Sequence, residues 1–303
     1  MTHPYGSEAY AASLAHLGAS FAVPEWGGHV LTRPTPHGVR RDAMGPYPLT
    51  ILKPGADVAT GLERLRAAGL VSVVLVLDNR MRPSLEALDQ AFDFARPYKS
   101  HHLHDRGLGP LAYDKHHRYE LKRALAQVRA VEIVLADHRQ AWGELYGELA
   151  ARRGLGDLHA FPPAYHDALA RLPGLRMFGA FVEQRLVSAH LFVTHDGYAV
   201  SHLAASSAEG YAARAAYAVN DIAVAALSDC GLINFGGGAG LVDDPTDGLV
   251  RFKRGFCNAV APSYLCGAVL DPDAYGALSI GHDQGGFFPA YRGRRARELS
   301  DAH

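Results

Sequence analysis

Cysteine is scarce in this sequence, which has three cysteines among 303 residues. Cys230, Cys257 and Cys266 form no Cys-x-x-Cys pair, which argues against a disulfide framework and favours a reducing compartment. No apolar run reaches the length of a membrane span, and residues 1–6 have neither the charged nor the hydrophobic region of a signal peptide. We therefore expect a cytoplasmic protein that does not enter a membrane.

An excess of one charge is also missing. The 30 Lys and Arg residues are balanced by 31 Asp and Glu residues, so the net charge of −1 does not indicate a nucleic-acid binder. The local balance differs: between Arg96 and Arg129 there are eight Arg and Lys residues and three Asp and Glu residues, a surplus of five. With 48% hydrophobic and 20% charged residues, the composition is that of a soluble globular enzyme.

Several catalytic motifs are absent as well. The sequence has no Gly-x-Ser-x-Gly elbow, and the glycines at 236–238 are not followed by the Lys-Ser/Thr of a Walker loop. The pairs at 101–102 and 116–117 are adjacent histidines, whose side chains point apart on a strand or a helix, so neither pair supplies two ligands to one ion. We expect no metal site and no tightly bound cofactor.

Strand-like and helix-like segments alternate along the chain, which is typical of an α/β protein. In the first half we expect strands at 21–23, 30–32, 49–52, 71–77 and 101–104, and helices at 59–68, 84–95 and 115–127. In the second half we expect helices at 138–151, 163–171 and 208–229, and strands at 175–182, 186–194 and 198–204. Because the second half repeats the plan of the first, we expect two domains, 1–137 and 138–303.

The most informative segment begins at 234–238, where Asn-Phe-Gly-Gly-Gly indicates a strand that ends in a glycine turn. The backbone can approach a ligand there because no Cβ blocks it. A short helix follows, with Asp247 or the residue before it as its cap. Phe252 and Phe256 are four residues apart and anchor this helix in a core, whereas Lys253 leaves the helix beside that face. A lysine held in this way can stabilise an oxyanion or hold a phosphate or carboxylate.

The segment from Asp247 to Phe256, together with the glycine turn, resembles the Fem family of aminoacyl-tRNA-dependent transferases, which have a duplicated GNAT acyltransferase fold. The preceding strand, the Ser206-Ser207 pair and the Ala-rich helix are similar to that family too, and the resemblance is good over about 110–280. It implies an α/β protein of two tandem GNAT-like halves, with mixed sheets flanked by helices. The acceptor side would lie in 1–137 and the catalytic motif in 138–303.

The residues and this resemblance together suggest roles for named side chains. Lys253 would stabilise the oxyanion, and His202, Asp247 or a chain of water molecules would act as the base. The expected substrate-binding residues are Arg41, Tyr47, Ser206, Tyr217, Asn234, Gly236, Gly237 and Phe252. Structural roles remain open for several of them: an ion pair for Lys253, a helix cap for Asp247, a buried hydrogen-bonded histidine for His202, core packing for Tyr217, a turn cap for Asn234, and a surface turn for 40–48.

The turn at 204–211 bears on the identity of the acyl donor. A CoA-dependent GNAT enzyme grips the pyrophosphate with a glycine-rich, basic turn at a helix start. The corresponding turn here, 204–211, has one glycine, no basic residue and the acidic Glu209. This departure favours an aminoacyl-tRNA donor over acyl-CoA or an acyl carrier protein, which remain the alternative.

The basic segment bears on the same choice. In a helix at 115–127, the core side would consist of Leu121, Ala124, Leu125 and Val128. The outer side would carry a basic stripe that can meet tRNA phosphates or can be a solvated helix face. The expected tRNA-binding residues are Lys115, Arg118, Lys122, Arg123 and Arg254.

Three functions follow from these observations. The first is an aminoacyltransferase that forms an amide bond on a small-molecule amine, as in specialised metabolite assembly, because the inserted helical arm of cell-wall Fem enzymes is missing. The second is an acyl-CoA- or carrier-protein-dependent N-acyltransferase. The third is a non-catalytic, degenerate GNAT fold that binds RNA or a metabolite.

Overall fold

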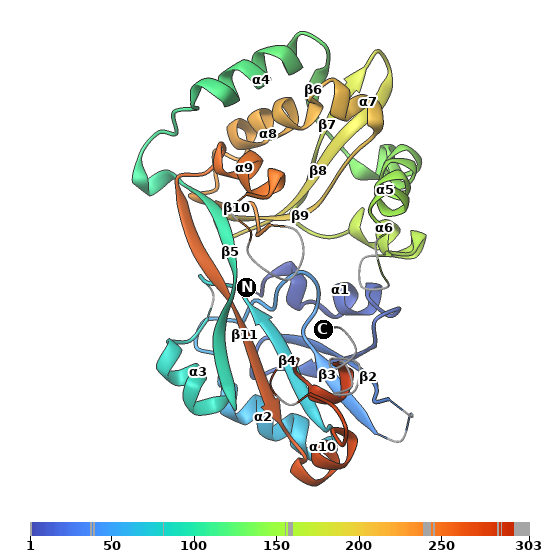
Figure 1. Ribbon diagram of the computed structural model, residues 1–303, viewed down its shortest axis with the longest axis vertical. Coiled ribbons are helices and arrows are strands. Elements are labelled where there is room, and N and C mark those ends of the chain that lie inside the picture. The colour runs from blue at the N-terminus through green and yellow to red at the C-terminus, as the bar shows by residue number, and fades with distance from the viewer. Residues whose placement is uncertain are drawn as a thin grey trace, which may run out of the picture. The chain divides into compact units, whose positions relative to one another are not determined.

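The computed structural model describes residues 2–36, 38, 40–80, 82–154, 156, 160–238, 244, 246–283, 285 and 287–293. They form two compact units (Figure 1). Unit 1 comprises the described residues within 1–98 and 263–303, and unit 2 comprises those within 99–262. The chain passes from unit 1 to unit 2 within the strand β5 (Phe94–Asp105) and returns within the strand β11 (Ala259–Val269).

Unit 1 is a small α/β unit. Its remaining strands are β1 (Ala19–Val23), β2 (Gly28–Pro34), β3 (Arg41–Met44) and β4 (Ser72–Leu77). Its helices are α1 (Glu8–Ser13), α2 (Val58–Ala67), α3 (Leu85–Ala91) and α10 (Pro272–Leu278), with short 3₁₀ turns η1 (Pro4–Gly6) and η4 (Ala290–Arg292). The strand order is β1-β2-β3-β4-β11, in which only the β3–β4 pair is parallel. Buried side chains of β4 and α2 form its core, among them Val73, Leu75, Leu62 and Leu65.

Unit 2 is an α/β unit with a larger sheet, which has helices on both faces. Its strands are β6 (Arg129–Ile133), β7 (Leu175–Val182), β8 (Arg185–His195), β9 (Tyr198–Ser206) and β10 (Leu232–Asn234). Its helices are α4 (Lys115–Leu125), α5 (Arg139–Arg153), α6 (Pro163–Leu169), α7 (Ala208–Ala212), α8 (Ala215–Ala226) and α9 (Gly248–Arg254), with η2 (Arg106–Leu108) and η3 (Leu135–Asp137). The strand order is β5-β10-β9-β8-β7-β6.

The turns of unit 2 follow from local sequence. Asp196 and Gly197 both have positive φ and join β8 to β9 in the tight hairpin that the sequence predicts. The next pair, β9 and β10, is parallel, so the chain must cross over between them, and α7 and α8 make that crossover. Figure 1 shows α4 and α8 on one side of β6–β9, and α5 and α6 on the other.

The prediction of one long helix at 208–229 is wrong. Two helices occupy this segment, because Arg214 adopts a left-handed conformation with φ 57° and ends the run of helical hydrogen bonds between α7 and α8. The Ser207 side chain caps α7 by accepting a hydrogen bond from the Gly210 N–H. The alanine-rich composition of the segment gives no sign of this break.

Four smaller expectations also need correction. The helix predicted at 84–95 ends at Ala91, and the chain from 94 onward belongs to β5. The strand predicted at 49–52 is only an isolated bridge of Thr50 to Leu77. The loop predicted at 40–48 begins instead with the strand β3. In α4 the buried side is formed by His117, Glu120 and Ala124, whereas Leu125 is 52% exposed and does not face the core.

The expected mixed α/β architecture, with a mixed sheet flanked by helices, is confirmed. The predicted domain boundary after residue 137 falls at the end of η3, inside unit 2, and stays a prediction about the two GNAT-like halves. No helix among the described residues is both long and apolar enough to cross a membrane.

Candidate functional site

The glycine turn after β10 is the centre of the candidate site in unit 2. Gly236 has φ +74°, a conformation that side-chain-bearing residues rarely adopt. Its N–H donates to Asn234 Oδ1 at 2.8 Å, and its carbonyl accepts from the His102 N–H at 3.1 Å. A Cβ on Gly238 would lie 2.8 Å from a methyl group of Val250. The turn therefore needs glycine for conformation at one end and for space at the other.

Two lysines donate to successive carbonyls of this turn. Lys253 Nζ of α9 donates to the Gly237 carbonyl at 2.6 Å. Lys99 Nζ of β5 donates to the Gly238 carbonyl at 2.9 Å. Among the described residues no carboxylate lies within 4.0 Å of the Lys253 ammonium, so the structural ion pair considered for this residue does not form there.

Lys253 is an unusual lysine electrostatically. Burial lowers its pKa to about 8; the adjacent Cys257 and Asp247 favour the charged form, whereas Lys99 disfavours it. The ammonium form still predominates at neutral pH. A partly desolvated cation that is fixed at a backbone turn is suited to stabilising a developing negative charge.

Asn234 holds the turn from the strand side. It is fully buried, and its Nδ2 donates to Tyr198 Oη at 2.9 Å and lies 3.1 Å from His101 Nδ1. Its Oδ1 accepts from the Gly236 N–H. These contacts give Asn234 the turn-capping role that the sequence left open beside substrate binding.

The helix α9 is fixed by its cap and by an aromatic cluster. Asp247 caps α9 by accepting from the Leu249 N–H at 2.9 Å, so the helix begins where the sequence predicts. The rings of Phe252 and Phe256 lie 5.2 Å apart, as their spacing of four residues suggests, and both contact Tyr217 of α8. Tyr217 is therefore a packing residue, and burial raises the pKa of its hydroxyl.

His117 joins α9 to α4. Its Nε2 lies 3.0 Å from the Phe252 carbonyl, and its ring packs against Phe256. A Cβ on Gly255 would lie 1.7 Å from the same nitrogen. Gly255 has an ordinary helical φ of −71°, so glycine is required here for space and not for conformation.

His190 of β8 is a buried histidine that interacts with the charge of Lys253. Asn220 Nδ2 donates to the Ala216 carbonyl, so Asn220 Oδ1 faces His190 Nδ1 at 2.7 Å. His190 Nδ1 therefore carries the proton, and Nε2 accepts from Ser201 Oγ at 2.7 Å. Burial lowers the pKa of His190 to about 3; the Asn220 hydrogen bond opposes this shift and the Lys253 charge adds to it. His190 is thus neutral at physiological pH.

This histidine gives the fold an acid sensitivity that can be measured. The unfolded chain binds a proton at this side chain near pH 6.5, whereas the folded chain does so only near pH 3. Between these values the unfolded state holds more protons, so the free energy of unfolding should fall as pH falls, by up to about 1.4 kcal/mol per pH unit. Urea unfolding of the wild type and His190→Gln at pH 7, 6 and 5 tests this expectation. In His190→Gln the free energy of unfolding should fall less steeply with falling pH than in the wild type, because one histidine no longer contributes. Parallel pH dependences in the two proteins would contradict the low pKa of His190.

His202 lies apart from Lys253. A register shift between Leu191 and Phe192 leaves His202 as an extra residue on β9. Its Nε2 lies 2.7 Å from Tyr165 Oη of α6, on the face opposite α8. The structure therefore matches the buried, hydrogen-bonded histidine that the sequence left open, and no described hydrogen bond joins His202 to Lys253.

The other expected substrate residues have structural contacts as well. Ser206 Oγ is buried and lies 2.8 Å from Ser188 Oγ across the β8–β9 pair. Arg41 and Tyr47 belong to unit 1. Arg41 Nη2 donates to the Thr32 carbonyl at 2.8 Å, and burial raises the pKa of Tyr47 to about 12. An acceptor role for these two residues stays a prediction.

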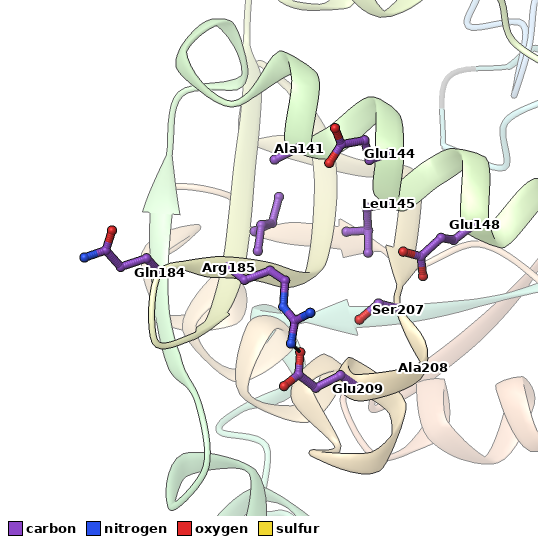
Figure 2. A pocket seen from close by; sticks show the side chains of 10 residues that line it. Ala141, Glu144, Leu145, Glu148, Gln184, Arg185, Ser207, Ala208 and Glu209 are labelled. Carbon is purple, nitrogen blue, oxygen red and sulfur yellow. Dashed lines mark hydrogen bonds and ion pairs between the residues drawn. The ribbon is translucent and has the colours of Figure 1, made fainter.

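A cavity of about 400 Å³ lies beside the start of α7 (Figure 2). It is lined by one face of α5, the β7–β8 turn and the first residues of α7, namely Ala141, Glu144, Leu145, Glu148, Gln184, Arg185, Leu186, Ser207, Ala208 and Glu209. The Arg185 guanidinium is paired with the Glu209 carboxylate, as the dashed line in Figure 2 marks. Glu144 and Glu148 of α5 are not balanced by another cation of the lining, so the lining carries net negative charge.

The outer side of α4 carries the expected basic residues. Lys115, Arg118, Lys122 and Arg123 are exposed, and so is Arg254 at the end of α9. We call these five residues the basic face. The one acidic residue within α4, Glu120, is buried and paired with Arg214, so it does not neutralise the basic face.

Sequence reasoning missed several residues of this site. Lys99 and Gly238 are separated by 139 positions, and the chain contains no local pattern that pairs them. His190, Asn220 and Tyr165 likewise acquire their contacts only through the sheet and its helices. Among the described residues, no group of three His, Cys, Asp or Glu side chains is arranged to hold a metal ion.

Several solved structures share the fold of this chain at low sequence identity. FemX is 12% identical, with a TM-score of 0.64 over 91% of this chain and 95% of its own. The C-terminal domain of a lysylphosphatidylglycerol synthetase from Agrobacterium fabrum is 16% identical, with a TM-score of 0.59 over 90% of each chain. L-PGS from Bacillus licheniformis is 13% identical, with a TM-score of 0.54 over 89% of this chain and 93% of its own. No family model and no curated protein matches the sequence. These likenesses confirm the expected Fem-type fold.

Proposed function

We propose that this protein is an acyltransferase that moves an aminoacyl group from an aminoacyl-tRNA to the amine of a small molecule. The observation that carries the proposal is the Lys253 ammonium at the glycine turn, in a fold shared with FemX and lysylphosphatidylglycerol synthetase over about nine-tenths of the chain. The second of these names denotes a product that carries a lysyl group, which is aminoacyl chemistry. The Fem-like segment at 247–256 supports the same reaction class.

The reaction requires a stabilised oxyanion. The acceptor nitrogen attacks the ester carbonyl carbon of the donor, a C–N bond forms, and the carbonyl oxygen becomes negatively charged. When this intermediate collapses, the C–O bond to the tRNA ribose breaks, and the hydroxyl leaves with a proton. Lys253 supplies a positive charge that needs no reorganisation at that moment. Of the two candidate bases, Asp247 is the better placed, because it lies on the lysine's own helix whereas His202 faces α6.

The cavity at the start of α7 supports the choice of donor. In a CoA-dependent enzyme this helix start receives a doubly negative pyrophosphate. Here the Ser207 N–H already donates to the Val187 carbonyl, and the Gly210 N–H donates to Ser207 Oγ. The cavity lining adds glutamates where a pyrophosphate needs cations. Both features disfavour CoA and leave the aminoacyl ester as the better donor.

A cell-free transfer assay tests the proposed function. Purified protein would be given tRNA charged with a mixture of labelled amino acids, together with a panel of small amines, and amide products would be followed by mass spectrometry. Digesting the charged tRNA with RNase beforehand should abolish product. Product that persists after digestion would overturn the donor assignment, and saturable acetyl-CoA binding in a parallel titration would replace it with CoA chemistry.

The basic face gives a prediction about binding. We expect the Lys122→Ala/Arg123→Ala variant to bind charged tRNA more weakly, and the dependence of log Kd on log salt concentration to become shallower by about 0.7 to 0.9 for each tRNA phosphate that the variant no longer neutralises. Filter binding at several salt concentrations measures both quantities. Arg171→Ala removes an exposed arginine outside the basic face and serves as the control. Equal salt slopes in all three proteins would show that the basic face is only solvated.

A further inference from the structure

Lys99 shares the glycine turn with Lys253. The stem of Lys99 packs along the turn, since a Cβ on Gly237 would lie 3.3 Å from both Cβ and Cδ of Lys99. Its Nζ donates to the Gly238 carbonyl, one residue beyond the carbonyl that Lys253 holds. The backbone of β5 contributes as well, because the His102 N–H donates to the Gly236 carbonyl. Three successive carbonyls of the turn are thus each fixed by a separate donor.

Fixing these carbonyls also fixes the direction of a backbone donor. A peptide unit is planar and trans, so its N–H points away from its C=O. When Lys253 holds the Gly237 carbonyl, the N–H of Gly238 in the same peptide is directed to the opposite side. The Lys99 bond to the Gly238 carbonyl prevents rotation of the following peptide. A turn without Lys99 would keep one of its two cationic restraints.

The two ammonium groups also influence each other electrostatically. Like charges close together disfavour each other's protonated form, and the Lys99 charge lowers the pKa of Lys253. The other groups that act on Lys253 are Cys257 and Asp247, which both favour its charged form. Among these groups, Lys99 is the one that, like Lys253, donates a hydrogen bond to a carbonyl of the glycine turn.

We infer that Lys99 is a positioning residue for the candidate site: its ammonium group holds the Gly238 carbonyl as Lys253 holds the Gly237 carbonyl, so the glycine turn and the Lys253 charge are fixed together. The catalytic consequence of this role rests on the proposed function. The physical coupling of the two lysines does not, because it requires neither tRNA nor acceptor.

Competitive acetylation measures this coupling directly. The intact protein would be treated with a trace of acetic anhydride at pH values from 6 to 11, and the labelling of each lysine would be read by peptide mass spectrometry against a reference amine. Methionine keeps the unbranched stem while removing the charge. In Lys99→Met the labelling midpoint of Lys253 should rise by about half a pH unit or more. In Lys253→Met the midpoint of Lys99 should rise by the same amount, because coupling between two sites is reciprocal.

Two further variants separate positioning from general packing. Lys99→Arg keeps the charge and a donor, so the Lys253 midpoint should stay at its wild-type value. Lys53→Met removes a lysine of unit 1 that also donates to a backbone carbonyl, that of Pro24, and should shift nothing. An unchanged Lys253 midpoint in Lys99→Met, or a missing reciprocal shift, would overturn the inference. If Lys99→Met does not fold by circular dichroism, the Lys253→Met measurement decides alone, since it reports the same coupling from Lys99.

Discussion

Lys253→Met should lower the rate of aminoacyl transfer by about 10²- to 10³-fold, the usual loss when one oxyanion donor is removed. The loss should appear in kcat, because the charge develops in the transition state and not in the bound ester. Single-turnover transfer from charged tRNA measures it. Lys53→Met, which removes a lysine far along the chain in unit 1, should retain wild-type activity. An unchanged kcat in Lys253→Met would show that Lys253 does not take part in the reaction.

The pH dependence tells which form of Lys253 acts. If the ammonium stabilises the oxyanion, the rate should fall as pH rises through about 8, where the amine loses its proton. If the neutral amine acts as a base, the rate should instead rise through the same pH. Lys253→Arg keeps the charge at all these pH values, so any activity it retains should lack the fall. A rising limb in the wild type would replace the electrostatic role with a base.

Stability should change with pH in the opposite sense to activity. The unfolded chain holds the Lys253 proton up to about pH 10.5 and the folded chain only up to about pH 8. Between these values the unfolded state binds more protons, so the free energy of unfolding of the wild type should rise with pH relative to Lys253→Met. The protein thus keeps a charged lysine where burial disfavours it. This is the pattern of a residue retained for function.

Most elements could be predicted because their signals are local. The alternation of β7, β8 and β9, the Asp-Gly hairpin and the Asp247 cap depend on residues that are neighbours in sequence. The break at Arg214 could not be predicted, because arginine rarely adopts a left-handed conformation and the composition of the segment gives no signal of it.

The candidate site likewise has a part that local sequence predicts and a part that depends on long-range contacts. The spacing of Phe252, Lys253 and Phe256 correctly placed the aromatic anchor and the lysine beside it. The charges that interact across the fold come from elsewhere in the chain: Lys99 of β5 lowers the pKa of Lys253, and Lys253 in turn lowers the pKa of His190 of β8. Such pairs depend on sheet register, which one sequence specifies only through the whole fold. His202 illustrates the converse, since its position on a strand suggested chemistry while the register shift aims it at Tyr165.

Gly255→Ala is expected to be among the most damaging single substitutions in unit 2. The new methyl group would lie 1.7 Å from His117 Nε2, and the ring is buried, so either α4 or α9 must move. Overpacking of this kind costs about 1–3 kcal/mol, which urea unfolding would detect. Transfer activity should fall further than stability alone explains, because displacement of α9 also displaces Lys253, and an error of about 1 Å in a catalytic group can cost about 10²-fold in rate.

A double-mutant cycle with His117→Ala identifies the cause. His117→Ala removes the obstructing ring and its contact with the Phe252 carbonyl, so it destabilises the protein by itself. In that background Gly255→Ala should cost little, because the methyl group then enters the vacated space, and the two changes should be strongly non-additive. If Gly255→Ala costs the same with and without the ring, the clash is not its cause. The glycine of the Fem-like segment would then be required for a reason other than the α4–α9 contact, and the link from His117 through α9 to Lys253 would fail with it.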